Sequence, residues 1–343
     1  MKKLPLGKVP KDVLLNFVLK DVHCYEDVLL PPAFGEDGAV VKSKDNLIIA
    51  ASDPITGASE DAGWLSVHVN ANDIAVHAAY PKWYLVTLLF PPNTVREDIA
   101  NVMKGIKKGL EEVRASLIGG HTEITDKVKD VVIIGAMIGE PMIPGKFITS
   151  GGAKPRDDII LTKGAGIEGT LILAVDFEKE LVKKVDKSII ENAKKFRNKI
   201  SVLPEIKTII QSFDIEYIHA MHDVTEGGLL GGVHEMAYAS QLGFEIYEEK
   251  IPILKETKEI CKVLNLDPLK LISSGSLLIA TDPTISANIV KMLKQKGINA
   301  AIIGHFIKEN PGVGYLIKRN GSKEIISEPP IDELWRFLSM RSI

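Results

Sequence analysis

A chain of 343 residues is long enough for two domains that each bury a core of their own. Hydrophobic residues are 45% and charged residues 25%, as in globular proteins, and a net charge of −3 gives no electrostatic argument for binding nucleic acid or a membrane. The two cysteines, Cys24 and Cys261, exclude a disulfide framework and a cysteine zinc site. We find no signal-peptide pattern and no apolar run near the roughly 20 residues of a membrane helix, so we expect a cytoplasmic protein.

The first part of the chain alternates helical and strand-like patterns. Apolar periodicity predicts helices over Val13–Val22, Ser59–Ala79 and Thr94–Val113. Short β-rich runs predict strands over Gly38–Lys42, Leu47–Ser52, Tyr84–Phe90, Ser116–Gly119 and Val131–Ile138. Glu60 and Asp61 suit the positive end of the second helix, and we expect Pro81 to end it.

A stretch rich in proline and glycine, from Glu140 to Arg156, divides the chain. Beyond it we predict strands over Asp158–Thr162, Tyr217–Met221 and Phe244–Tyr247, helices over Ile189–Lys199, Pro204–Phe213, Gly228–Ser240 and Leu254–Leu264, and a β/α/β passage over Ser276–Phe306. Neither half has the strict βαβ rhythm of a parallel sheet, so we predict an α+β fold. We expect two domains, over residues 1–145 and 155–329, and a C-terminal tail over 330–343.

Two adjacent acids, Glu36 and Asp37, lie between Gly35 and Gly38, just before a predicted strand. Glycine lets the backbone turn tightly and lets a ligand approach. Asp53 follows at the end of the next strand, and carboxylates at loop and strand ends suit Mg²⁺, which prefers oxygen ligands. The alternative is a solvated acidic hairpin.

A polar stripe runs along the predicted helix over residues 59–79. Asn70, Asp73 and His77 lie at i, i+3 and i+7, on one helical face, among small and apolar neighbours. An acid in such surroundings is costly to bury unless it is paired or binds a metal. The alternative is a stripe that faces water or a second subunit.

The segment Gly119-Gly120-His121-Thr122-Glu123 follows an apolar run. Paired glycines expose backbone N–H groups that can bind an anion, and the Thr122 hydroxyl and Glu123 carboxylate can bind phosphate or metal. The alternative is an isolated glycine turn.

Another glycine pattern follows the strand Asp158–Thr162. After Lys163, the residues Gly164, Gly166 and Gly169 match the spacing G-x-G-x-x-G. A dinucleotide site also needs a second buried strand that ends in an acid about 20 residues on. The residues at that place, Lys183–Lys187, are too polar for a buried strand, so the spacing is weak evidence for NAD.

The segment His222-Asp223-Val224-Thr225-Glu226-Gly227-Gly228 joins a predicted strand to a predicted helix. Free N–H groups and the positive helix end then point toward an anion. The alternative is a simple N-cap by Thr225.

Together, these stretches resemble the AIR synthase superfamily over roughly Pro31 to Pro329. Gly35–Ala39 is similar to its motif G-[DE]-D-x-A, and Asn70–Pro81 to N-x-S/N-D-[IL]-A-x-x-G/A-A-x-P. Gly119–Glu123 is similar to G-G-[DHE]-T, and His222–Gly228 to H-D-[VP/A]-T-x-G-G. Among the members, the glycine-rich segment after Thr162 and the Gly-Gly-His-Thr-Glu form look most like HypE.

The resemblance implies two PurM-like domains, the first pairing its strands with those of a second subunit in a β-barrel. It implies ATP and Mg²⁺ as cofactors, with the metal held by Asp37, Asp53, Asp73 and Glu123. It implies catalytic roles for Asp37, Asp73 and His121. His121 stands where thiamine-monophosphate kinase has an acid, which Glu123 could replace. The implied cofactor-binding residues are Gly35, Asn70, Gly119, Gly120, Thr122, Lys163, Gly164, Asp223, Thr225, Gly227 and Gly228.

The activity that the resemblance implies is ligase- or kinase-type phosphoryl transfer from ATP to a substrate oxygen, by a homodimer and on a small molecule. The alternative is an ATP-binding maturation factor that docks a partner protein without turnover. HypE ends in a cysteine that carries a carbamoyl and then a cyano group, whereas this chain ends Leu338-Ser339-Met340-Arg341-Ser342-Ile343. We therefore expect neither Cys24 nor Cys261 to carry such a group.

Overall fold

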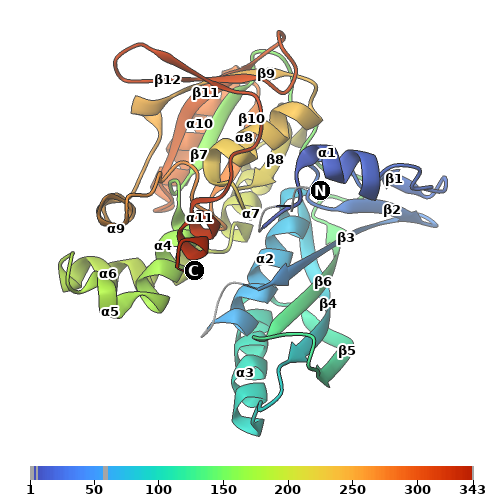
Figure 1. Cartoon of the computed structure of the whole chain (residues 1–343). Coiled ribbons are helices and arrows are strands. Elements are labelled where there is room, and N and C mark those ends of the chain that lie inside the picture. The colour runs from blue at the N-terminus through green and yellow to red at the C-terminus, as the bar shows by residue number, and fades with distance from the viewer. Residues whose placement is uncertain (1–3, 5–6, 57–60, 342–343) are drawn as a thin grey trace. The chain divides into compact units, whose positions relative to one another are not determined.

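The computed structural model describes residue 4 and residues 7–56 and 61–341 (Figure 1). The chain forms two compact units, which we call the N-unit (26–31 and 37–147) and the C-unit (1–25, 32–36 and 148–343). The C-unit thus includes two early segments that the sequence analysis assigned to the first domain. Each unit combines helices with a mainly antiparallel sheet, which confirms the α+β class. Within the described ranges, no helix is long and apolar enough to cross a membrane.

The N-unit contains a six-stranded sheet in the order β1-β2-β3-β6-β4-β5. Its strands are β1 (Val28–Leu30), β2 (Ala39–Ser43), β3 (Asn46–Ile55), β4 (Ala79–Phe90), β5 (Ser116–Ile124) and β6 (Val132–Pro141). Neighbouring strands are antiparallel except β4 and β5, which run parallel. The strand β5 therefore forms one edge of this sheet.

Helix α2 (Ala62–Val76) packs on β3, β4 and β6 and is buried along its whole length, with α3 (Arg96–Val113) packed against it (Figure 1). The Tyr84 hydroxyl, from β4, donates to Ser66 Oγ on α2 over 3.0 Å. On β6, a Cβ at Gly135 would lie 2.5 Å from Asn70 Nδ2, so only glycine lets α2 approach this closely. The helix explains why β4 and β6 bury alternate residues.

The opposite face of this sheet is apolar and open within the N-unit. Alternation along β4 and β6 places Leu85 and Ile134 on the face away from Tyr84, and they remain 37% and 38% exposed. Among the described residues of the N-unit, no helix covers this face, because α3 packs against α2. Apolar side chains on an open sheet face are typical of an interaction surface.

One expectation about the N-unit, that Pro81 ends the second helix, is wrong. The turn after α2 is made at Ala78, with φ of 56°, so Pro81 lies inside β4 instead of ending the helix. Proline cannot donate a ladder hydrogen bond, and the β4–β6 register shifts between Pro81 and Trp83. The predicted helix start at Ser59 and Glu60 lies outside the described residues, and Asp61 directly precedes α2.

The C-unit contains a seven-stranded sheet in the order β13-β12-β9-β11-β7-β10-β8. Its strands are β7 (Asp158–Thr162), β8 (Ile218–Asp223), β9 (Gly243–Tyr247), β10 (Leu277–Thr281), β11 (Ala300–Ile307), β12 (Gly314–Ile317) and β13 (Lys323–Ile326). Neighbours are antiparallel except β9 and β12. All five residues of β10 are buried, so both faces of the sheet centre are covered.

Two hydrophobic cores stabilise the C-unit. In the first, Leu229 and Val233 of α8 pack with Ile159 and Leu278 of the sheet. In the second, α4, α6, α9 and α11 bring together apolar residues such as Leu173, Ile190, Ile260 and Phe337. The helices of this unit are α1 (Lys11–Val13), α4 (Ile167–Asp176), α5 (Glu178–Leu181), α6 (Lys187–Lys194), α7 (Leu203–Ser212), α8 (Gly228–Ala239), α9 (Lys255–Leu264), α10 (Pro283–Gln295) and α11 (Glu333–Ser339).

The predicted helix over Val13–Val22 is wrong in length. The short α1 continues only as a π-helical turn, Leu14–Val18, and Asp21 takes a positive φ of 59°. Phe17 and Val18 are exposed, so no core supports a longer helix.

The segment 330–343, expected as a tail, contains α11, and residues 342 and 343 lie outside the described part. Leu334 and Phe337 are buried in the second core. Asp332 caps the helix by accepting from Leu334 N over 2.8 Å, and it also accepts from Gly227 N over 2.7 Å. The carboxylate therefore fastens the end of the chain to the start of α8.

Burial raises the pKa of the Asp332 carboxyl from 3.8 to about 7. The folded protein then binds this proton more tightly than the unfolded chain, so the contribution to stability is present below about pH 4 and is lost as the pH rises to about 7. We expect the free energy of unfolding of the wild type, relative to Asp332→Asn, to increase as the pH falls from 8 to 5, by about 1.4 kcal/mol for each pH unit below about pH 7. Urea denaturation across this range tests it, and a difference independent of pH would contradict it.

Candidate functional site

In the N-unit, Asn70 joins helix α2 to strand β3 with both ends of its side-chain amide. Its Oδ1 accepts from Asp53 N over 2.9 Å, and its Nδ2 donates to Asp53 O over 3.1 Å and to Ser66 O over 2.8 Å. The side chain is fully buried, so these bonds satisfy an amide that water cannot reach. They place Asp53 against the helical turn that also carries Asp73.

The polar stripe of α2 faces the protein interior. Asn70, Asp73 and His77 are all buried, so the alternative of a stripe that faces water is wrong. Gly38 packs near the end of α2, because a Cβ there would lie 3.1 Å from His77 Nε2. The loop that carries Asp37 therefore runs against the end of α2, and three candidate acids come from segments that contact this helix: Asp37, Asp53 and Asp73.

The Gly119–Glu123 motif lies within strand β5, not after a strand. β5 pairs in register with β4, with Gly120 opposite Val86 and His121 opposite Thr87. Because Val86 is buried on the α2 side, Gly120 and Thr122 share that side, whereas Gly119, His121 and Glu123 face away from α2. His121 Nε2 and Glu123 Oε2 lie 3.4 Å apart and are exposed. Within the N-unit, these two residues are therefore on the opposite sheet face from Asp73.

The first half of the acidic motif belongs to the C-unit. Glu36 accepts from Ser150 N and from Gly151 N, each over 2.9 Å, so its carboxylate ties the early segment to the turn before β7. Gly35 lies against the carbonyl of Glu235 on α8. In this motif Glu36 is a structural acid, and Asp37, in the other unit, is the one left as a metal candidate.

The loop Lys163–Gly169 is satisfied by the protein itself. Ser273 Oγ accepts from Gly166 N over 2.8 Å and from Ile167 N over 3.2 Å, at the start of α4. Lys163 Nζ is buried, donates to Ser201 O and Gly275 O, and pairs with Glu205. The geometry favours a structural role for Lys163 and Gly164, although their proposed contact with a nucleotide stays a prediction.

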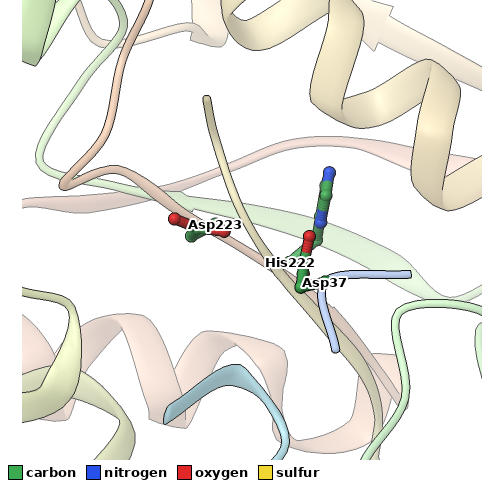
Figure 2. Close-up of side chains that lie close together, drawn as sticks. All are labelled: Asp37, His222 and Asp223. Atoms are coloured by element: carbon green, nitrogen blue, oxygen red, sulfur yellow. The ribbon is translucent and has the colours of Figure 1, made fainter. Parts of the chain in front are cut away.

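The segment His222–Gly228 runs from the end of β8 to the start of α8, and Figure 2 displays the side chains of His222 and Asp223 at that strand end. Both residues are buried. Thr225 does not cap α8, since no side chain caps this helix, so the simple N-cap alternative is wrong. The Gly227 N–H, expected to be free for an anion, is bonded to Asp332.

A network that the sequence analysis missed connects this segment to the N-terminal part of the chain. His222 Nε2 lies 3.0 Å from Glu235 Oε2, and Lys8 Nζ lies 3.4 Å from Glu235 Oε1 and donates to Thr225 Oγ1 over 3.2 Å. Burial raises the pKa of Glu235, but Lys8 and His222 outweigh it and hold this pKa at about 2. Because the carboxylate only accepts, His222 Nε2 carries the hydrogen of this bond. No sequence signal linked these residues.

The bonds of Asn70 lead to a test of the N-unit. In Asn70→Asp, a carboxylate oxygen would face the carbonyls of Asp53 and Ser66 in place of a donor. We expect the free energy of unfolding to fall by at least about 2 kcal/mol, since one oxygen of a buried carboxylate would face two carbonyl oxygens with no donor, and Asp53 N would be the donor to the other.

Urea denaturation measures this loss. Asn46→Asp, at the exposed first residue of β3, is the matched control and should change stability by less than about 0.5 kcal/mol. Equal stability of the two variants would contradict the role of Asn70.

The sequence resembles proteins of known families over nearly its whole length. The family model described as AIR synthase related protein, N-terminal domain, matches residues 35–140, and the C-terminal domain model matches residues 154–317. A putative hydrogenase expression/formation protein of Methanocaldococcus jannaschii is 30% identical over 346 residues, covering 96% of both chains.

More distant relatives carry two further descriptions. The carbamoyl dehydratase HypE of Rhizobium leguminosarum is 24% identical, covering 84% of this chain and 79% of its own. The thiamine-monophosphate kinase of Pyrococcus horikoshii is 27% identical, covering 71% of this chain and 74% of its own.

Solved structures have the same two-domain fold. The hydrogenase maturation protein HypE in complex with ATP superposes with a TM-score of 0.70 at 19% identity, over 92% of this chain and 90% of that one. A HypE–HypF complex gives 0.71 at 20% identity, over 84% and 93%. Together with the M. jannaschii relative and the two domain models, these matches establish that the chain belongs to the AIR synthase related protein family.

Proposed function

We propose that this protein binds ATP and Mg²⁺ and transfers a phosphoryl group from ATP to an oxygen of its substrate. The observation that carries the proposal is the convergence of Asp37, Asp53 and Asp73 on helix α2, with Asn70 holding Asp53 in place. The relatives support it, since they include a kinase and a dehydratase, and a HypE of this fold was solved with ATP. The substrate itself is set by residues that differ among members of one fold.

The donor set suits Mg²⁺, because carboxylates are hard oxygen ligands and Asp73 is buried in an otherwise largely apolar helix. Asp37, Asp53 and Asp73 would hold the metal, which when bound neutralises charge on the phosphate oxygens. The role of these three residues is then to position the nucleotide. Asn70 acts on the site through Asp53, because its own amide is used within the protein.

In the C-unit, we propose Asp223 and Thr225 as contacts for the phosphates. Both lie between the end of β8 and the start of α8, where backbone and side-chain groups can meet an anion. The N–H of Gly227 is bonded to Asp332, so Gly227 and Gly228 would shape the loop more than donate to a ligand. The bonds of Lys163 and Gly164 within the protein favour the same structural role.

We also propose a homodimer. His121 and Glu123 lie on the sheet face opposite α2, and the same face exposes Leu85 and Ile134. A second copy packed on this face would cover the apolar side chains, and twofold symmetry is the commonest arrangement for such contacts. His121 and Glu123 of both copies would then lie at this interface, and Gly119, Gly120 and Thr122 would lie at the same edge of the sheet.

A second candidate is an ATP-binding maturation factor that docks a partner protein without turnover. It is favoured by the M. jannaschii relative, described as a hydrogenase expression/formation protein, and by the solved HypE–HypF complex. A carrier thiol has little support, because burial raises the pKa of Cys261 to about 12, and residues 331–341 contain no cysteine. Release of ADP in the presence of a substrate distinguishes the enzyme from the docking factor.

Nucleotide binding is the first test. Saturating Mg·ATP should raise the melting temperature, because a ligand that binds only the folded state stabilises it. Asp73→Asn should reduce this shift clearly, whereas Asp45→Asn, in an exposed turn, should leave it unchanged. A metabolite screen for ADP release then follows. A shift with NAD but none with Mg·ATP, or full ATP binding by Asp73→Asn, would count against the proposal.

Assembly is the second test. Light scattering should give a mass near twice 37.5 kDa at micromolar concentration. Leu85→Glu places a charge on the open sheet face, so we expect this variant to be largely monomeric. Lys82→Glu, exposed at the start of the same strand, is the control. A monomeric wild type would overturn the dimer and leave His121 and Glu123 without a site.

A further inference from the structure

The N-terminal segment reaches the candidate phosphate loop from outside both matched family domains, which cover residues 35–140 and 154–317. Lys8 N donates to Glu226 Oε1 over 2.6 Å. Gly7, with φ of 94°, packs so closely on Glu226 and Trp335 that a Cβ would overlap the Glu226 carboxylate. The backbone before Lys8 is thus fixed between the loop after β8 and helix α11.

This anchoring delivers the Lys8 ammonium to two side chains. It donates to Thr225 Oγ1 over 3.2 Å and pairs with Glu235 Oε1 at 3.4 Å. The Lys8 side chain is 53% exposed and that of Glu235 is 8% exposed. Lys8 therefore lies at the solvent side of the network and His222 at its buried end, 3.0 Å from Glu235.

The bond from Lys8 determines how the Thr225 hydroxyl can be used. An ammonium only donates, so Thr225 Oγ1 must accept, and the single hydroxyl hydrogen has to point elsewhere. Within the described part of the chain, Thr225 Oγ1 donates to no protein group. Thr225 is only half-buried, so an outside acceptor can reach it.

We propose that Lys8 is a positioning residue of the ATP site: by donating to Thr225 Oγ1, it directs the hydroxyl hydrogen of Thr225 toward a phosphate oxygen of the nucleotide. The proposal rests on the proposed function, because it takes ATP as the ligand. Glu235 keeps its bond to His222 when Lys8 is lost, so the variants should still fold, and their melting temperatures show how much of any loss of binding is structural.

The test is a double-mutant cycle in the full-length protein, with the affinity for Mg·ATP measured by isothermal titration calorimetry. We expect Lys8→Met and Thr225→Val each to weaken binding about tenfold, and the double variant to be no weaker than Thr225→Val alone, because both remove one donated hydrogen bond. Lys8→Arg keeps the donor and should restore affinity to within about threefold.

Lys11→Met is the matched control. Lys11 belongs to the same segment and pairs with Glu328 at 3.0 Å, away from Thr225, so its loss should change the affinity less than about twofold. Melting temperatures of Thr225→Val and Lys11→Met should stay within about 2 °C of the wild type. Should Lys8→Met lower the melting temperature further, Lys8→Gln, with a shorter neutral side chain, replaces it in the cycle.

The outcomes separate the two proposals. Two results would overturn the role of Lys8 and leave the proposed function standing, provided that the wild type binds Mg·ATP. In the first, the losses of affinity caused by the two single substitutions multiply in the double variant. In the second, Lys8→Met and Lys11→Met have the same affinity for Mg·ATP. A failure of Lys8→Arg to restore affinity does the same. No binding of Mg·ATP by the wild type overturns the proposed function, and the inference with it.

Discussion

The complete burial of helix α2 is the constraint on which the N-unit depends. Its sequence carries Ser66, Asn70 and Asp73 into the interior, and a buried polar group must find a partner. The Asn70 side-chain amide accepts from the N–H of Asp53 and donates to its carbonyl, as the backbone of a neighbouring strand would. Ser66 Oγ accepts from the Tyr84 hydroxyl. The helix can meet these partners only because the sheet offers glycine beneath it. The buried helix thereby carries Asp73 and fixes the backbone of Asp53, two of the candidate metal ligands.

In the C-unit, the glycine-rich loops before α4 and α8 both have sequences that indicate N–H groups free to bind an anion, but N–H groups in both loops are bonded within the protein. The N–H groups at the start of α4 are bonded to Ser273, and the N–H of Gly227 is bonded to Asp332. Both loops are thus closed by side chains of the protein. Beside α8, the hydroxyl hydrogen of Thr225 remains open to a ligand. A pattern of glycines indicates close backbone packing, and only the partners of the N–H groups decide whether an anion can bind.

The segments at the two ends of the chain contribute to the same loop. Lys8 contacts Thr225 and Glu226, and Asp332 contacts Gly227. Neither residue lies within the matched family domains. The terminal segments are therefore part of the C-unit, where they surround the loop between β8 and α8, and α11 is a packed helix with two buried side chains.

The amino-acid sequence by itself determined the α+β class, the family, and most of the strands and helices of the C-unit. These follow from local periodicity, as in β7 and α8, and from short motifs whose residues are neighbours in the chain. Sequence patterns could not place Pro81 within β4, because the pairing of β4 with β6 outweighs the usual effect of proline. They also could not assign His121 and Glu123 to a sheet face, since the strand continues through Ile124.

Only the tertiary structure decided which polar groups are used by the protein and which can meet a ligand. Lys8 and Thr225 are 217 residues apart, and Gly227 and Asp332 are 105 residues apart. Hydrogen bonds over such separations leave no periodic pattern in the sequence, because each depends on a single donor and a single acceptor brought together by the packing of whole elements. For the same reason, the sequence indicated the chemistry of this protein, and the fold decided which atoms are placed to perform it.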